Sequence, residues 1–271
     1  MASSRASPIA TQSDIDVDPP GGRNFVTALA RGLSVIEAFD GQDTQMTLSD
    51  VARVANLSRA TVRRSLLTLQ ALGYVTASGR YFSLSPQVLT LARAYLSSSL
   101  LPRVAQPFLE RVSETIAESC SVSILHGEEV IYVARSSRKR MASLHRDVGT
   151  HLPAHCTSMG RVLLATLSAG ELDRFLRSAV LGAFTPHTVT DPAALRLVLA
   201  QAARDGWCLV DQELEIDLRS LAVPVCNGGG RVVAALNVST QAGRTSREHM
   251  LTVFLPVLRA AAADMRPLLV G

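Results

Sequence analysis

The sequence predicts an α+β protein of two domains, because the spacing of its apolar residues changes once along the chain. Over residues 24–101, apolar side chains recur at the three- and four-residue spacing of amphipathic helices, interrupted by one short hairpin pattern. From residue 122 onward, short runs rich in β-branched residues are bounded by turn residues and separated by helices. At 271 residues the chain is long enough for two hydrophobic cores.

Composition and charge exclude several classes of protein. Apolar residues make up 47% of the sequence and charged residues 18%, which is typical of a globular chain. No uncharged run reaches the ~18 residues that a membrane-spanning helix needs, so we expect no membrane partner. Residues 1–23 are rich in Ser, Pro, Asp and Gly and lack the order of a signal peptide, which predicts a disordered leader on a cytoplasmic protein. The formal net charge is only +4, so any contact with nucleic acid must be local.

The most informative motif lies at residues 48–67, LSDVARVANLSRATVRRSLL. Its pattern predicts two short helices joined by a tight turn. Asn56 falls at the turn, where its side chain tolerates a left-handed φ, and Ser58 is placed to cap the second helix. The apolar side of that helix consists of Val62, Leu66 and Leu69. This helix-turn-helix layout allows the second helix to enter the major groove of DNA.

The other side of this second helix is cationic and carries no acid, as entry into the major groove requires. Gly73 ends the helix, and residues 74–84 predict a hairpin, or wing, that turns at Ser78 and Gly79. The alternative is a surface helix with ordinary solvated arginines. The candidate DNA-binding residues are Ser58, Arg59, Thr61, Arg63 and Arg64, with Arg80 on the wing expected to contact backbone phosphate.

An amphipathic helix at residues 24–40 precedes the motif and completes a winged helix-turn-helix domain over residues 24–86. We expect its apolar side to consist of Phe25, Leu29, Leu33, Ile36 and Phe39. A linker helix is expected within residues 87–105, ending at Pro102.

Residues 106–271 predict an α+β domain with one curved antiparallel sheet. Strands are expected at residues 122–125, 129–134, 143–146, 208–211, 221–225 and 232–239. Helices are expected at residues 108–119, 158–166, 169–178, 193–205 and 247–269. Thr157 and Ser158 open one of these helices, whose free N–H groups would favour an anion such as a carboxylate; the alternative is that Ser158 only caps its helix.

Over essentially all of residues 24–271, the chain resembles the IclR family of bacterial transcription regulators. The resemblance rests on the helix-turn-helix LSDVARVANLSRATVRRSL, the hinge after Gly73-Tyr74, and three later blocks: GTHLPAHCTSMGRVLLA, GWCLVDQELEIDLRSL and AALNVST. The reading LPAHCTSMGRVLLA looks most like the Pca-type branch, whose members regulate the catabolism of protocatechuate and 4-hydroxybenzoate through the β-ketoadipate pathway.

The resemblance implies a DNA-binding transcriptional regulator with a GAF-like effector-binding domain, no cofactor and no catalytic residues. It implies a homodimer or a tetramer that binds double-stranded DNA and senses a small organic acid. Met159 and Asn237 replace a small residue and a hydroxyl residue that are common in the family, which argues against an acid of two or three carbons. The implied effector-binding residues are Met141, Leu144, Leu152, Ser158, Met159, Asp211, Ser220, Asn237 and Ser239.

Three alternatives remain open at this point. His155 and Cys156 precede a helix, and Asp211 could orient the histidine as in a Cys–His–acid hydrolase, although adjacent residues on an extended segment point to opposite sides. A zinc site is conceivable among His145, His151, His155 and Cys156. The third alternative is a sensor module that does not bind DNA.

Overall fold

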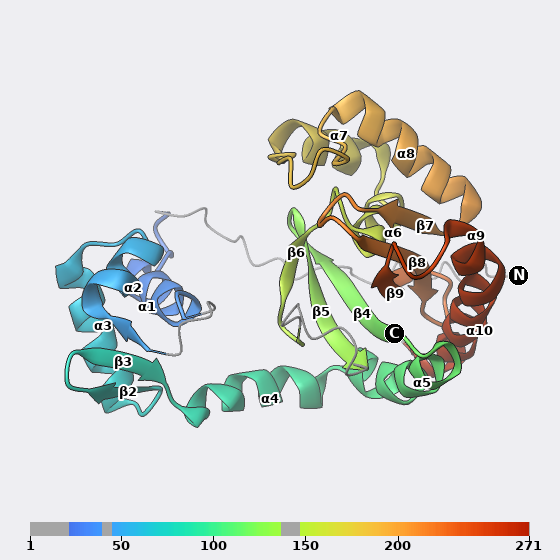
Figure 1. Ribbon diagram of the computed structural model, residues 1–271. Helices are drawn as coiled ribbons and strands as arrows, with labels where there is room; N and C mark the ends of the chain where they lie inside the picture. Colours follow the sequence, from blue (N-terminus) through green and yellow to red (C-terminus); the bar gives the residue numbers. More distant parts are fainter. Residues whose placement is uncertain (1–21, 40–44, 137–146, 271) are drawn as a thin grey trace, which may run out of the picture. The chain divides into compact units, whose positions relative to one another are not determined.

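The computed structural model describes residues 22–39, 45–136 and 147–270 (Figure 1). It divides into two compact units, Met1–Ala94 and Tyr95–Gly271, and the boundary falls within helix α4 (Leu89–Ser98). The predicted leader up to residue 21, the predicted strand at residues 143–146, and the candidates Met141, Leu144 and His145 lie outside the described residues.

The first unit has the predicted winged-helix architecture. Its helices are α1 (Thr27–Glu37), α2 (Leu48–Val54) and α3 (Arg59–Ala71). Its strands β1 (Met46–Thr47), β2 (Val75–Ser78) and β3 (Tyr81–Leu84) form an antiparallel sheet in the order β1-β3-β2, followed by a short 3-10 helix, Pro86–Val88. The shared core includes Val35, Val51, Val62, Leu66, Leu69 and Val75.

Local signals fix the two helices of the motif. Thr47 and Asp50 form a reciprocal capping box at the start of α2. Asn56 has φ 52° in the turn, and the backbone N–H of Thr61 donates to Ser58 Oγ (3.2 Å) at the start of α3. Gly73 follows α3 with φ 82°, a conformation that favours glycine. The turn and cap predictions for this motif are therefore confirmed.

The predicted apolar side of α1 is only partly buried. Val35 is fully buried and Phe39 nearly so, but Leu29 and Leu33 are 62% and 46% exposed. Their side chains lie along a groove between α1 and α3 instead of in the core. Apolar spacing identified the side of the helix correctly, but it could not show how much of that side the same chain covers.

The second unit is built on a six-stranded antiparallel sheet in the order β6-β5-β4-β9-β8-β7. Its strands are β4 (Ser119–His126), β5 (Glu129–Ser136), β6 (His151–Pro153), β7 (Cys208–Asp211), β8 (Leu218–Cys226) and β9 (Val232–Gln241). Its helices are α5 (Leu100–Ile116), α6 (Ser158–Leu164), α7 (Ala169–Ser178), α8 (Pro192–Asp205), α9 (Arg247–His249) and α10 (Leu255–Met265). A π-helical turn, Met250–Phe254, joins α9 to α10, and a 3-10 turn, Arg266–Leu268, follows α10.

Pro102 and Pro153 both lie within regular elements of the second unit. Pro102 does not end the linker helix; α4 ends at Ser98, and Pro102 lies in the first turn of α5, where proline has no N–H that needs a partner. Pro153 is the last residue of β6 and pairs with Glu129, which is possible because β6 is an edge strand.

The two faces of the sheet pack against different helices (Figure 1). On one face α5 and α10 cover a core that includes Val122, Leu221 and Val238. On the other face α6, α7 and α8 cover Tyr132, Ala222 and Ala235. Side chains alternate along a strand. The polar residues that alternate with Val122, Leu221 and Val238 therefore project to the other face, toward α6. This second face is where a small-molecule site can form.

Candidate nucleic-acid interface and small-molecule site

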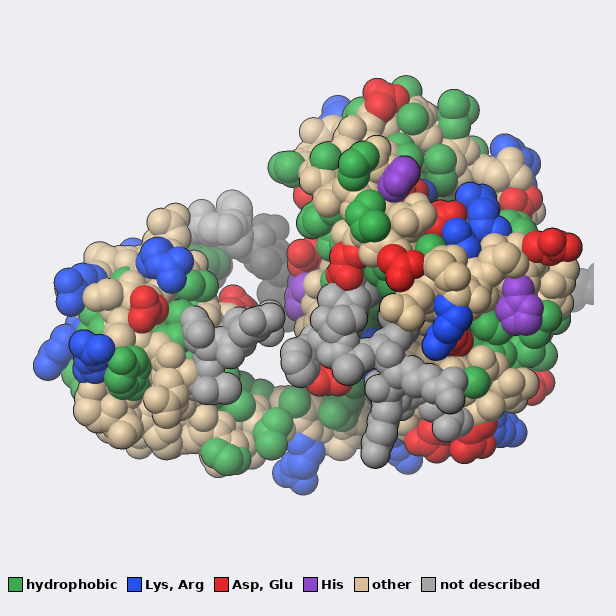
Figure 2. Space-filling model, viewed as in Figure 1, with side chains coloured by type: hydrophobic (Ala, Val, Ile, Leu, Met, Phe, Trp, Pro, Cys, Tyr) green, Lys and Arg blue, Asp and Glu red, His purple; other side chains and the backbone are tan. Residues whose placement is uncertain are grey.

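The outer side of α3 carries the predicted cationic surface. Arg59 and Arg63 are exposed, and neither forms an ion pair within the described ranges. Figure 2 shows basic side chains over α2 and α3 of this unit. Since Val62, Leu66 and Leu69 anchor the opposite side of α3 in the core, its arginines are held outward. The geometry suits insertion into the major groove.

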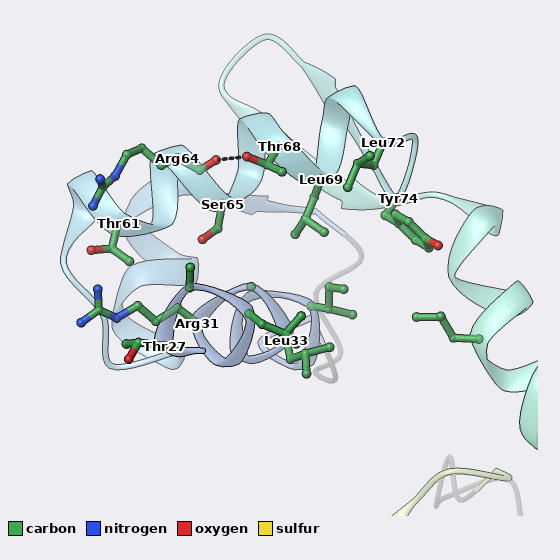
Figure 3. Close-up of a pocket in the computed structure, with 15 residues that line it drawn as sticks. Thr27, Arg31, Leu33, Thr61, Arg64, Ser65, Thr68, Leu69, Leu72 and Tyr74 are labelled. Carbon is green, nitrogen blue, oxygen red and sulfur yellow. Dashed lines mark hydrogen bonds between the residues drawn. The ribbon is translucent and has the colours of Figure 1, made fainter. Parts of the chain in front are cut away.

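Thr61 and Arg64 lie on a different side of α3 from Arg63. Both line the groove beside α1, and Thr61 Oγ1 is 2.9 Å from Ser58 Oγ within the helix cap. Figure 3 shows the Arg31 and Arg64 side chains at the end of this groove opposite Leu72 and Tyr74. Ser58, which is exposed, and Thr61, which is half-buried, therefore stabilise the start of α3.

Arg80 lies where the wing prediction placed it, in the turn between β2 and β3. Its Nη2 donates to the hydroxyl of Tyr81 (3.0 Å), and its guanidinium carbon lies 5.1 Å from the centre of that ring. The hydrogen bond to Tyr81 raises the pKa of Arg80, so the group stays cationic. The ring thus orients an exposed positive charge at the tip of the wing.

The groove between α1 and α3 has a volume of about 780 Å³ and is mainly apolar (Figure 3). Leu33 and Leu69 face its interior, and Leu91 from the start of α4 also lines it. Further exposed apolar side chains nearby in the sequence are Val26, Leu29, Leu72 and Leu89. An apolar surface of this extent is typical of a protein–protein contact.

A second, much smaller cavity lies between α6 and the sheet in the second unit. Its volume is about 10 Å³, room for roughly one water molecule. Four predicted effector residues line it: Leu152, Met159, Ser220 and Ser239. The other lining residues are Tyr132, Cys156, Thr157, Val210, Leu214 and Leu218. Four of the predicted residues thus lie together at one cavity, whose aromatic wall, Tyr132, the sequence blocks did not indicate.

Ser158 and Asn237 lie beside these lining residues with unsatisfied polar atoms. Thr157, not Ser158, caps α6, because Thr157 Oγ1 accepts from the N–H of Gly160 (3.2 Å) and donates to the carbonyl of Pro153 (3.0 Å). Ser158 Oγ and Asn237 Oδ1 are buried and have no hydrogen-bond partner among the residues described. Asn237 Nδ2 donates to Ser239 Oγ (3.2 Å).

The structure does not bring Asp211 to the cavity. Arg219 donates to both of its carboxylate oxygens (2.9 and 3.0 Å), and Arg247 lies 3.6 Å from one of them. Arg219 also donates to the carbonyl oxygens of Ala242 and Thr245. Asp211 therefore fixes one end of the sheet, and it is not positioned to orient His155.

A buried ion pair holds the wall of the cavity. Arg161 Nη1 and Nη2 donate to the two carboxylate oxygens of Glu213 (2.6 Å each), and Arg161 Nε donates to the carbonyl of His155 (2.7 Å). Glu213 also accepts from the N–H of Val189 (3.0 Å). The pair thereby ties the loop that carries Leu214 to α6.

The histidine and the thiol of the hydrolase alternative are engaged elsewhere. His155 Nε2 lies 3.0 Å from the carbonyl oxygen of Gly182, and burial lowers the pKa of His155. Burial raises the pKa of Cys156 to about 12, so its thiol stays protonated at neutral pH. A protonated thiol is a poor nucleophile and a poor metal ligand.

For the zinc alternative, His151 Nδ1 lies 2.8 Å from Glu129 Oε2. Within the described ranges, no group of three or more His, Cys, Asp or Glu side chains could hold a metal ion. In the same ranges, no helix combines the length and apolar character needed to cross a bilayer.

Comparison with known proteins covers nearly the whole chain. Residues 28–79 match the IclR helix-turn-helix domain, and residues 93–266 match the C-terminal domain of bacterial transcriptional regulator IclR. The Pca regulon regulatory protein of Pseudomonas putida is 46% identical over 246 residues, which cover 90% of this chain and 84% of that protein.

Two solved structures are also similar. A protein from Rhodococcus sp. RHA1 is 48% identical, with a TM-score of 0.79, over 90% of this chain and 98% of that chain. An IclR homologue from Microbacterium hydrocarbonoxydans, crystallised in complex with 4-hydroxybenzoate, is 30% identical, with a TM-score of 0.76, over 89% of this chain and 98% of that chain.

Proposed function

The chain belongs to the IclR family of bacterial transcriptional regulators, and from this premise we propose that it controls a catabolic operon in response to a small aromatic acid. It would act in the bacterial cytoplasm, where its operator lies. The observation that carries the DNA-binding part is the outer side of α3, where Arg59 and Arg63 are exposed and free of acidic partners in the described chain.

Two copies of α3 would enter successive major grooves of a pseudo-palindrome, with half-sites about one helical turn apart or a multiple of it. Arg59 and Arg63 are assigned to base edges. Arg64 and Thr61 lie at the flank beside α1, and Ser58 caps the start of α3. These three residues are assigned to the DNA backbone and the wall of the major groove. Arg80 on the wing is assigned to phosphate, which positions the protein without reading sequence.

A homodimer would cover the apolar groove of the first unit. The exposed leucines of α1 and the start of α4 have no cover within the described part of their own chain. Burying these leucines against a second copy would stabilise the dimer by ~25 cal/mol for each Å² of apolar surface removed from water. Light scattering on the full chain should report a dimer or a dimer of dimers, and a monomer would refute this assignment.

The effector would bind between α6 and the sheet. Apolar side chains of Tyr132, Leu152 and Met159 can enclose a ring, while Ser220 and Ser239 offer hydroxyl groups. Met141 and Leu144 remain candidates from the resemblance alone. The relative from Pseudomonas putida is named for the Pca regulon, and the Microbacterium structure holds 4-hydroxybenzoate, which supports an aromatic acid as effector.

The small volume of the cavity suggests how binding could be coupled to DNA affinity. At about 10 Å³ it cannot hold a ring, so its walls must move apart when the effector enters. A ligand shifts a conformational equilibrium only by its difference in affinity for the two states. A closed state that excludes the effector and an open state that binds it provide that difference.

Fluorescence anisotropy with the promoter DNA of the neighbouring operon tests the proposal. We expect specific binding in the nanomolar range that weakens steeply with salt. Addition of 4-hydroxybenzoate, protocatechuate or β-ketoadipate should change the affinity or the footprint. Failure to bind that DNA more tightly than an unrelated duplex would favour a sensor without a DNA role. Specific binding that none of the acids alters would refute the effector class alone.

A further inference from the structure

We propose that Arg135 binds the carboxylate of the effector, which makes it a specificity-determining residue of the second unit. This inference rests on the proposed function of that unit as an acid sensor. It replaces the sequence-based expectation that the carboxylate sits at Ser158. The ligand it favours is a flat molecule that carries one carboxylate and one hydroxyl group.

Arg135 projects from the face of the sheet that carries the cavity. It pairs with Ser121 on β4, and Ser121 pairs with Asn237 on β9. Residues directly opposite each other in a ladder project from the same face. Tyr132 lines the cavity from the same strand as Arg135, and a β-bulge between the two pairings keeps both on this face. Arg135 therefore lies next to the aromatic wall.

Arg135 is also a half-buried cation without a carboxylate partner in the described ranges. Arg161 and Arg219, the other arginines packed around this part of the sheet, are each held by a carboxylate in a bidentate pair. The Nε atom of Arg135 is buried and has no hydrogen-bond partner among the residues described. Its guanidinium carbon lies 5.8 Å from the centre of the Tyr132 ring. Burying such a donor without a partner is costly, and a carboxylate would remove that cost.

Three further buried polar atoms in the described part of this unit lack partners in the same way. Ser123 pairs with Tyr132 across the sheet. Within the described chain, Ser123 Oγ, Ser158 Oγ and Asn237 Oδ1 are buried and have no hydrogen-bond partner. These three residues are at most 1% exposed. No carboxylate lines the cavity within the described residues. The site thus combines a cation with an amide and hydroxyls, which matches an acid that also carries a hydroxyl group.

The test compares 4-hydroxybenzoate with 4-hydroxybenzamide, which has nearly the same shape but no charge. Isothermal titration calorimetry on the full chain should show that the wild type prefers the acid by roughly tenfold to a hundredfold. Arg135→Gln should lose this preference, so that the ratio of the two dissociation constants approaches one. Taking the ratio within one variant cancels general damage to the cavity. The control is Arg177→Gln, which removes a charge from an exposed position on α7 and should keep the wild-type ratio.

Arg135→Lys provides a second variant that keeps the charge but lacks Nε. It should retain only part of the preference, and a full wild-type preference in this variant would contradict the role of Nε. If Arg135→Gln prefers the acid as strongly as the wild type, Arg135 does not bind the carboxylate, although the acid-sensor function stands. If the wild type binds specific operator DNA but none of 4-hydroxybenzoate, protocatechuate and β-ketoadipate, both the sensor function and the role of Arg135 are refuted.

Discussion

Replacing Glu213 with glutamine tests how firmly the second unit holds the wall of its cavity. Glu213 and Arg161 meet through two 2.6 Å hydrogen bonds, and their side chains are only 10% and 3% exposed. Glutamine keeps one acceptor but removes the negative charge, which leaves the guanidinium of Arg161 buried without its counter-ion. Breaking a buried ion pair on one side costs about 3–5 kcal/mol.

In a unit of this size, 1 kcal/mol of unfolding free energy corresponds to about 2–4 °C in Tm. Because glutamine retains one acceptor, we take the lower limit of ~3 kcal/mol, which predicts a Tm lower by roughly 6–12 °C. Thermal unfolding of the full chain can be followed by the fluorescence of Trp207, the single tryptophan, which packs against the core of the second unit.

The matched control is Asp173→Asn, which breaks the exposed pair between Asp173 and Arg196. Their side chains are 43% and 47% exposed, so water screens the charges. An exposed pair contributes about 1 kcal/mol or less, and Tm should fall by no more than ~4 °C. Equal losses of Tm in Glu213→Gln and Asp173→Asn would show that burial adds nothing to the Arg161–Glu213 pair.

Arg63→Ala should weaken operator binding by about 5- to 150-fold and relax the preference at one base pair, since a base-reading arginine contributes ~1–3 kcal/mol. Fluorescence anisotropy with single-base operator variants measures both the affinity and the base preference. Unchanged values would mean that this side of α3 does not read DNA. At about pH 8 a thiol reagent should label Cys226 first, because burial raises the pKa of Cys120 and Cys156 to about 12 and that of Cys208 to about 11. Mass spectrometry after brief reaction identifies the labelled thiol, and rapid labelling of Cys156 would contradict its burial. Burial lowers the pKa of His155 below its ordinary value of 6.5. Below pH 6.5 the unfolded chain therefore binds a proton at this residue more readily than the native state does. The free energy of unfolding should fall as the pH drops below 6.5. Urea titrations between about pH 5 and 8 should show a flatter profile for His155→Gln, and an unchanged slope would exclude His155 as the cause.

The helix-turn-helix could be predicted in detail because its determinants are local. Asn56, Ser58 and Gly73 each act on the backbone within a few residues, and their φ angles and cap bonds agree with the prediction. Leu29 and Leu33 belong to the predicted apolar side of α1 and are nevertheless exposed, because apolar spacing shows which side of a helix is apolar, not what covers it.

The sequence blocks marked four of the residues that line the small cavity of the second unit, Leu152, Met159, Ser220 and Ser239. Asp211 was expected there, but Arg219, eight residues later, holds its carboxylate at the sheet end. The position of Arg135 beside Tyr132 could not be predicted, because their common face depends on a bulge and on pairing with β4. Asn237 reaches the same face from β9. Such pairings join residues far apart in sequence, so a pattern in one segment does not reveal them.

In the ligand-free protein, the walls of the small cavity pack together and leave no room for a ring. If the acid enters at this cavity, as proposed, the walls lined by Leu152, Met159 and Leu214 must first move apart. Its apparent affinity is then its intrinsic affinity multiplied by the fraction of time that the walls spend apart. The concentration at which half of the molecules respond is therefore set by wall packing as well as by the polar groups that grip the ligand. A regulator with such a site would respond only at effector concentrations higher than those that an open site would need.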